Sequence, residues 1–255
     1  MVGVMAEDNV RSCIVGHRGA GNSAPGSTMA ALEKAVELDL KWVEFDVRLT
    51  ADNHLVIANA DDLSGCSGQN IKISESALSD LLNVNVAESF EGTDDVHRIP
   101  LFEDAVAFCT EHGIRTQIEL KGEAGTEEAL AEAVVNSLNK QAFAVGGQPL
   151  ITSFTPKCLA AINRFSQGAL DTGLLIHTHL SDDWEDAAKE VDPDYIHLYG
   201  GVVNDEHLAD KFGQAVREAG YRLNAYKVNT QEDAQVAIEA GAERFTSDEP
   251  EILLG

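Results

Sequence analysis

The chain has 255 residues, of which 43 are acidic and 18 are basic, so its formal net charge is −25 at pH 7. We expect no nucleic acid or anionic membrane as a partner, because both are polyanions that an acidic surface repels. With 44% hydrophobic residues, the chain can bury a large core as one domain or at most two. It has no charged-then-apolar leader and no apolar run near the ~18 residues of a membrane span, which predicts a cytoplasmic protein.

The four cysteines are predicted to be free thiols. Cys13, Cys66, Cys109 and Cys158 are widely spaced and form no CxxC pair, so neither a zinc site nor a disulfide framework is indicated. Cys13, Cys109 and Cys158 lie on apolar segments, where we expect them to be small core residues.

A short apolar strand, a turn and an amphipathic helix alternate along most of the chain. The expected strands are 12–16, 42–49, 115–121, 150–153, 173–176, 195–198, 221–226 and 244–246. The expected helices are about 28–38, 100–111, 126–139, 156–165, 182–190, 205–219, 230–240 and a last turn at Pro250. This pattern predicts a single (β/α)8 TIM barrel domain over residues 1–255. A doubly wound open sheet is the alternative, but no glycine-rich dinucleotide loop opens the chain.

The alternation is interrupted after the second strand. The apolar run Leu55–Ala58 predicts a short hairpin strand, and one helix is expected around 76–82. The rest of the stretch from about 61 to 100 is irregular, and loops this long in compact domains are commonly functional. We therefore expect an irregular insertion at about 61–100, after strand two of the barrel.

Carboxylates recur on one face of two expected strands. Side chains alternate along a strand, so Glu44 and Asp46 face one way while their apolar neighbours face the other. Glu119 and Lys121 share a face of the next strand in the same way. Three carboxylates with room for water describe a Mg²⁺ or Ca²⁺ site that can also hold a phosphate. The alternative is the exposed polar face of an antiparallel sheet, which the intervening helices argue against.

Other polar residues fall at the expected C-terminal ends of strands, where barrel active sites lie. His17 and Arg18 follow the first strand in a loop bracketed by glycines, which favours a functional role. Tyr226 and Lys227 end the seventh strand. The ends of the remaining strands carry Ser153, His177, His197, Ser247 and Asp248.

Several motifs, in this order, resemble the glycerophosphodiester phosphodiesterase family. They are His17-Arg18-Gly19-Ala20, Ala24-Pro25-Gly26-Ser27-Thr28, residues 43–50, Ile118-Glu119-Leu120-Lys121, Tyr226-Lys227-Val228-Asn229 and Thr246-Ser247-Asp248-Glu249-Pro250. The resemblance runs from about Ile14 to Leu253. It implies a (β/α)8 barrel with an insertion after strand two. It also implies a metal-dependent hydrolase that converts glycerophosphodiesters into glycerol 3-phosphate and an alcohol.

Site residues follow from the resemblance by position. It implies a divalent ion, Mg²⁺ or Ca²⁺, held by Glu44, Asp46 and Glu119. Arg18 and Lys121 would contact the phosphate, and His17 would be one of two histidines that transfer protons. The implied partner is a small-molecule phosphodiester, and a homo-oligomer is left open.

The chain departs from the family pattern at three places. Pro25-Gly26-Ser27-Thr28 replaces Pro-Glu-Asn-Thr, which removes an acidic residue beside the metal, and Asp61 is a candidate to replace it. Asn59-Ala60 stands where the family has a His-Asp pair, so Asn59 occupies the position of the second catalytic histidine. Asparagine forms hydrogen bonds but cannot transfer a proton near neutral pH. Tyr226-Lys227 replaces Trp-Thr, which keeps an aromatic wall at the substrate and adds a charge.

Three functions stay open. The first is a working phosphodiesterase whose proton transfers use His17 together with Lys227 or a water at the metal. The second is a catalytically impaired barrel that binds phosphodiesters or phosphate esters as a sensor or partner subunit. The third is a metal-independent barrel with an unrelated sugar-phosphate reaction. Retention of the three carboxylates with His17 and Lys121 favours the first two.

Overall fold

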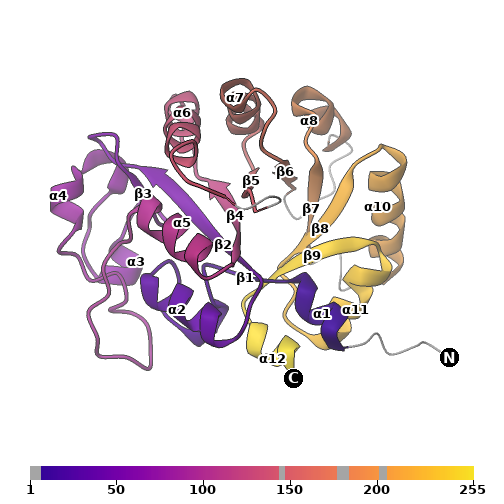
Figure 1. The fold of residues 1–255 in the computed structure, drawn as a ribbon, viewed down its shortest axis with the longest axis horizontal. Helices are drawn as coiled ribbons and strands as arrows, with labels where there is room; N and C mark the ends of the chain where they lie inside the picture. The colour runs from indigo at the N-terminus through magenta and orange to yellow at the C-terminus, as the bar shows by residue number, and fades with distance from the viewer. Residues whose placement is uncertain (1–6, 144–146, 177–183, 201–205) are drawn as a thin grey trace.

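Eight parallel strands close into a barrel surrounded by helices in the computed structural model, which describes residues 7–143, 147–176, 184–200 and 206–255 (Figure 1). The strands are β1 (Ile14–Gly16), β2 (Trp42–Leu49), β4 (Arg115–Leu120), β5 (Leu150–Ser153), β6 (Thr172–Leu175), β7 (Tyr195–Tyr199), β8 (Arg222–Tyr226) and β9 (Ala242–Ser247). They pair in the order β1-β9-β8-β7-β6-β5-β4-β2, and the pairing of β1 with β2 closes the ring. The predicted (β/α)8 barrel is confirmed.

The helices lie outside the barrel, in the connections between its strands and, for the last one, after β9 (Figure 1). They are α2 (Met29–Glu37), α5 (Phe102–Glu111), α6 (Glu127–Leu138), α7 (Pro156–Ser166), α8 (Trp184–Val191), α10 (Glu206–Glu218), α11 (Gln231–Glu239) and α12 (Pro250–Leu254). Thr28 caps α2, since its Oγ1 accepts a hydrogen bond from the backbone N of Ala31 at 3.3 Å. None of the helices described is both long and apolar enough to cross a membrane.

The two faces of β2 have different surroundings. Val43, Phe45 and Val47 belong to the main apolar core, and the Phe45 ring packs edge-on against Phe102 of α5 with 6.4 Å between ring centroids. The other face, which carries Glu44 and Asp46, points into the barrel. The strand alternation predicted from the sequence therefore divides β2 between the apolar core and the functional site.

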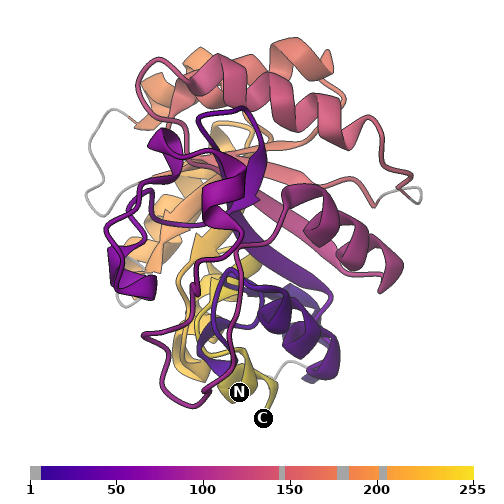
Figure 2. The same ribbon diagram turned by 90° about the vertical axis from the view of Figure 1, so that its left-hand side faces the viewer.

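An insertion follows β2 and packs beside the barrel. Strand β3 (Leu55–Ile57) pairs antiparallel with the end of β2, which confirms the predicted hairpin. It is followed by α3 (Ser64–Ser67), the 3-10 turn η2 (Ile73–Glu75) and α4 (Leu78–Leu81), the last of which confirms the expected helix around 76–82. Figure 1 shows α3 and α4 outside the ring of helices, and Figure 2 looks onto this side. The insertion has an apolar core of its own, formed by Val56, Ala58, Leu63, Ile73, Leu81, Val84 and Ile99.

The start of the chain differs from the prediction. Residues Glu7–Cys13 form a helix, α1, so the strand expected from Ser12 begins only at Ile14. Within α1, Val10 and Cys13 pack against the main core, and the helix lies against α12. A helix this short is stabilised by tertiary packing rather than by its own sequence, because isolated helices under ~12 residues are marginal in water.

The cysteines are free thiols, as predicted. Cys109 and Cys158 are fully buried core residues, whereas Cys13 is only partly buried. Burial raises the pKa of the Cys109 thiol to about 12 and that of Cys158 to about 11. Both thiols are therefore protonated and unreactive at neutral pH.

Candidate active site

Three carboxylates converge inside the C-terminal half of the barrel. Parallel pairing of β2 with β4 places Asp46 opposite Glu119. The ligand atoms of Glu44, Asp46 and Glu119 all lie within 4.8 Å of one another. These residues are only 3%, 1% and 8% exposed, respectively, so their carboxylates are largely removed from water.

The proximity of these carboxylates shifts their pKa values. Burial, and then the charges of Asp46 and Glu119, raise the pKa of Glu44 well above its ordinary value. Burial, followed by the charge of Asp46, raises the pKa of Glu119 to about 7. Lys121 offsets part of this repulsion, because its Nζ lies 3.0 Å from Asp46 Oδ1 and contacts Glu119. Burial alone would lower the pKa of Lys121, but these two carboxylates outweigh it and raise the pKa.

The donor set fits a divalent metal ion. Glu44 Oε1 and Asp46 Oδ2 are buried and have no hydrogen-bond partner. Leaving carboxylate oxygens unpaired in the interior is costly unless a cation binds them. Hard oxygen ligands of this kind are the ones that Mg²⁺ and Ca²⁺ prefer. The three side chains are therefore suited to hold such an ion.

The loop after β1 brings a positive side chain to the carboxylates. The backbone N of Arg18 donates to Glu44 Oε2 at 3.0 Å, and its Nε lies 3.6 Å from Asp46 Oδ2. Arg18 has a φ of 52° and Gly19 follows at 105°. The left-handed conformation costs a non-glycine residue ~1–2 kcal/mol. In this left-handed conformation, the backbone N and the side chain of Arg18 both reach the carboxylates.

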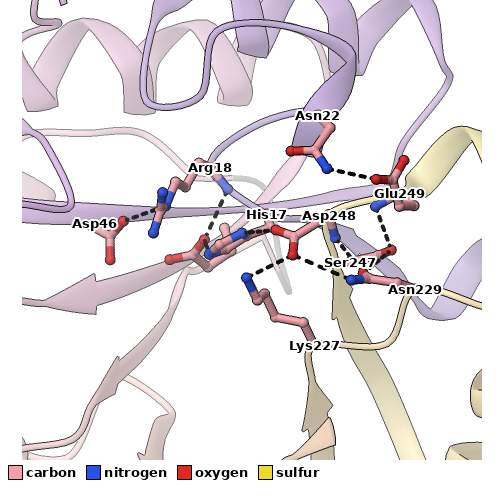
Figure 3. A network of polar contacts seen from close by, with 10 residues as sticks. His17, Arg18, Asn22, Asp46, Lys227, Asn229, Ser247, Asp248 and Glu249 are labelled. Atoms are coloured by element: carbon pink, nitrogen blue, oxygen red, sulfur yellow. Dashed lines mark hydrogen bonds and ion pairs between the residues drawn. The ribbon is translucent and has the colours of Figure 1, made fainter. Parts of the chain in front are cut away.

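His17 is held by residues from the other end of the chain (Figure 3). Its Nδ1 is hydrogen-bonded to Asp248 Oδ1, while its Nε2 lies 3.8 Å from Glu44 Oε2. The second oxygen of Asp248 is 2.7 Å from the Nζ of Lys227. The backbone N of Asp248 donates to Asn229 Oδ1 at 2.9 Å, which holds the carboxylate in place. This network fixes the imidazole ring with Nε2 toward the carboxylates.

The network also sets the protonation of its members. Burial lowers the pKa of His17, although the hydrogen bond to Asp248 acts in the opposite direction. Burial alone would raise the pKa of Asp248, but the hydrogen bonds from His17 and Lys227 outweigh it and hold this pKa well below its usual range. Near neutral pH, Asp248 is therefore ionised and His17 is neutral. The Nδ1 of His17 then carries the hydrogen, and its Nε2 is able to accept a proton.

Tyr226 presents its aromatic ring to the candidate site, because its hydroxyl is engaged by the backbone. The ring packs edge-on against Phe154 and Tyr199, with centroids 5.7 and 5.8 Å away. The hydroxyl donates to the backbone oxygen of Ile176 at 2.5 Å. Burial raises the pKa of this hydroxyl, so it stays protonated. Tyr226 is thus part of an aromatic wall, as its position in the sequence suggested.

Asn59 lies on the wall of a cavity of about 330 Å³ that Arg18, Gly26 and Ser27 also line. Its backbone oxygen accepts hydrogen bonds from Nε and Nη2 of Arg48, at 3.0 and 2.8 Å. Asn59 therefore shares a cavity with Arg18, whereas the contacts that hold His17 come from Asp248 and Glu44.

Other candidates from the sequence are not in the site. Asp61 does not fill the vacant acidic position, because its carboxylate accepts hydrogen bonds from the N and Oγ of Ser74, both at 2.8 Å. His197 does not line the pocket either. It is fully buried, 3.4 Å from Asn224 Nδ2, and burial lowers its pKa to about 3. His177 lies outside the described residues.

One functional residue received no role from the sequence. Asp248 was visible only as a polar residue after the last strand, within the closing segment that resembles the family. Its contact with His17 requires β1 and β9 to be neighbours, and Gly16 does pair with Ser247. The available signal was its position at a strand end, which gives no partner by itself.

Comparison with known proteins identifies the family. The chain matches the glycerophosphoryl diester phosphodiesterase family over residues 17–252. It belongs to this family. The predicted enzyme class, a phosphoric diester hydrolase, is therefore confirmed.

Relatives of this phosphodiesterase-family chain align over nearly its whole length. The YqiK protein of Bacillus subtilis is 26% identical over 238 residues, which cover 93% of this chain and 95% of that protein. A glycerophosphodiester phosphodiesterase of Caldanaerobacter subterraneus is 22% identical over 249 residues, covering 96% and 97%. A phosphodiesterase of Oleispira antarctica, solved with the product sn-glycerol-3-phosphate, superposes with a TM-score of 0.84 at 24% identity and 98% coverage of both chains. This last similarity shows a shared fold.

Proposed function

We propose that the chain is a metal-dependent glycerophosphodiester phosphodiesterase that releases glycerol 3-phosphate and an alcohol. The observation that carries this proposal is the buried trio Glu44, Asp46 and Glu119, with Arg18 and Lys121 in contact with it. In a chain with a net charge of −25, such a centre would give a phosphodiester anion a local positive site once a divalent ion is bound. Family membership and the product bound to the Oleispira relative support the choice of substrate.

The residues that would bind metal and substrate have three roles. The three carboxylates would hold Mg²⁺ or Ca²⁺, which when bound polarises the phosphoryl oxygens. Arg18 and Lys121 would bind the phosphate and orient it through charge-assisted hydrogen bonds. Tyr226 would bound the substrate with its ring.

Proton transfer would be centred on His17. Its Nε2 would accept the proton of a glycerol hydroxyl that attacks phosphorus, and water would then open the cyclic phosphate to give glycerol 3-phosphate. Asp248 would hold the ring and stabilise the imidazolium that forms. The ammonium group of Lys227 lies at the second oxygen of Asp248 and would add a positive charge to this network. The departing alcohol would take its proton from Lys227 or from solvent, because Asn59 cannot supply one.

Asn59 favours a second candidate function. A site that binds metal and phosphate but lacks one proton-transferring group suits a catalytically impaired barrel that acts as a sensor or partner subunit. Loss of one general acid or base costs ~10²–10⁴ in rate. The two candidate functions therefore predict different hydrolysis rates but the same binding of metal and phosphate.

A single assay separates them. Glycerol 3-phosphate release from glycerophosphocholine would be measured with Mg²⁺, with Ca²⁺ and with EDTA. We expect release with a metal ion and none with EDTA. Binding of both metal and substrate without turnover would instead support the impaired barrel. A cytoplasmic location and an assembly of identical subunits stay predictions.

A further inference from the structure

Two cavities lie near the carboxylate trio. The first, of about 330 Å³, is lined by Arg18, whose Nε lies 3.6 Å from Asp46. The second, of about 210 Å³, is lined by Glu119 and Lys121, and the latter lies 3.0 Å from Asp46. A phosphodiester has two ester groups, so a phosphate bound at the trio can direct one group toward each cavity.

The second cavity is suited to a polyhydroxy group. Besides Glu119 and Lys121, the apolar residues Leu120 and Phe154 line it, together with the polar or charged Arg48, Glu123, Ser153 and Thr155. The polar and charged side chains supply both donors and acceptors for hydroxyl groups. The glycerol part of a glycerophosphodiester matches this chemistry.

The wall of the first cavity has two charged residues, Arg18 and Asp62, against four in the second. Much of it is apolar, and most of that part comes from β3 and the insertion: Ile57, Ala58, Ala60, Leu63, Val86 and Ile99. The positive charge of Arg18 lies on the side that contacts Asp46. The acidic residue of this wall is Asp62, which is exposed and accepts a hydrogen bond from the backbone N of Ser64 at 2.8 Å. A cationic alcohol would thus meet Arg18 without a buried anion to compensate.

Two residues that line this cavity have a buried polar atom without a hydrogen bond, although Arg18 Nε lies 3.6 Å from Asp46 Oδ2. The Oγ of Ser27 is buried without a hydrogen-bond partner, and so is Arg18 Nε. Gly26 leaves the space beside Arg18 open, because a Cβ built there would lie only 3.2 Å from the Arg18 Cβ. A volume of about 330 Å³ is at the lower end of ordinary ligand pockets, ~300–1,000 Å³.

We propose that the first cavity binds the leaving alcohol of the substrate and selects an uncharged, largely apolar alcohol over a cationic one. This inference rests on the proposed function, because it assigns the two ester groups of the same substrate. The glycerol group occupies the second cavity, and the phosphate lies at the carboxylate trio, between the two cavities.

The test compares two probes that share a phosphate and differ in the alcohol. Binding of hexyl phosphate and of phosphocholine to the Ca²⁺-loaded protein is measured by calorimetry. We expect hexyl phosphate to bind at least tenfold more tightly. Equal affinity, tighter binding of phosphocholine, or no binding of either probe would overturn the inference.

Substitutions in the first cavity test whether the alkyl group of hexyl phosphate binds there. Gly65→Phe places a ring on the cavity wall, where a Cβ meets no atom within 4 Å, and should weaken hexyl phosphate binding at least tenfold. Ser64→Phe is the matched control, an exposed neighbour on α3 outside the lining, and should leave the affinity unchanged. Ser89→Phe, at an exposed position of the same wall, repeats the test if Gly65→Phe does not fold. Unchanged affinity in folded cavity variants would place the alkyl group elsewhere.

Binding and turnover distinguish this inference from the function on which it rests. Selective hexyl phosphate binding in a protein that hydrolyses no glycerophosphodiester would refute the proposed function and leave the cavity assignment standing. Hydrolysis of glycerophosphocholine at least as fast as of glycerophosphohexanol, at equal subsaturating concentrations, would refute the cavity assignment and leave the function standing.

Discussion

His17 is hydrogen-bonded through Nδ1 to the carboxylate of Asp248, although 231 positions separate the two residues in the chain. The contact forms because β1 and β9 are neighbours in the closed barrel. The same carboxylate also binds Lys227, so one acidic residue connects two basic side chains (Figure 3). Asp248 is therefore a positioning residue for the proposed proton acceptor.

Replacing Asp248 by asparagine should lower kcat by about 10²–10⁴ while metal affinity changes little, because an amide holds the imidazole in the wrong tautomer. The measurement is glycerol 3-phosphate release, together with a metal titration by calorimetry. Glu249→Gln is the matched control, since Glu249 binds Asn22 instead of His17. A full rate in Asp248→Asn would show that His17 does not depend on this contact.

Replacing Glu119 by glutamine should weaken Mg²⁺ and Ca²⁺ binding and abolish hydrolysis, because it removes one negative ligand. Loss of an outer-shell partner already costs ~10–100-fold in metal affinity, so loss of a ligand should cost at least as much. Calorimetric titration with each ion provides the measurement. His54→Ala and His97→Ala are controls outside the trio and should retain both properties. Undiminished activity of Glu119→Gln would disprove the metal assignment.

Introducing the missing histidine should raise activity. Asn59→His, combined with Ala60→Asp to orient the ring, should increase the hydrolysis rate on the order of 10²-fold if only proton transfer is lacking. The pH–rate profile should gain a limb near the ordinary histidine pKa of about 6.5. Ala60→Asp alone is the control and should give no such limb. A folded, metal-binding double variant without any gain would mean that the site works by another route or serves for binding.

Buried His197 should make stability depend on pH. Burial, and then the charge of Arg244, lower its pKa to about 3, against 6.5 for an ordinary histidine. The unfolded chain therefore takes up this proton first. As pH falls below 6.5, the free energy of unfolding decreases by up to about 1.4 kcal/mol per pH unit until about pH 3. Above pH 6.5 this contribution to stability is fully present.

His197→Gln removes that titration. Urea unfolding at pH 7 and pH 5 should show a smaller loss of stability for the variant than for the unaltered protein, by up to about 2 kcal/mol. The exposed His54 offers a control, and His54→Gln should keep the original difference between the two pH values. Identical differences in the His197→Gln and unaltered proteins would contradict the assignment.

Local patterns in the sequence were enough for much of the fold. The period-two alternation on β2 separated Val43 and Phe45 from Glu44 and Asp46, and the structure keeps that division. Strand, helix and insertion boundaries agree within a few residues, because buried apolar runs and capping residues such as Thr28 are local signals. Helix α1 was missed because its stability comes from the core and α12 rather than from its own residues.

The sequence by itself determined which residue types line the mouth of the barrel, since strand ends and side-chain alternation are properties of short segments. Only the tertiary structure decided which of them meet. Asp46 faces Glu119 because β2 and β4 pair in that register, and His17 meets Asp248 because the barrel closes. Asn59 lines a cavity together with Arg18, and Asp61 is hydrogen-bonded to Ser74, because the insertion packs around a core of its own. Such contacts depend on distances through space that no local pattern encodes, because residues far apart in the chain become neighbours only when the sheet is complete.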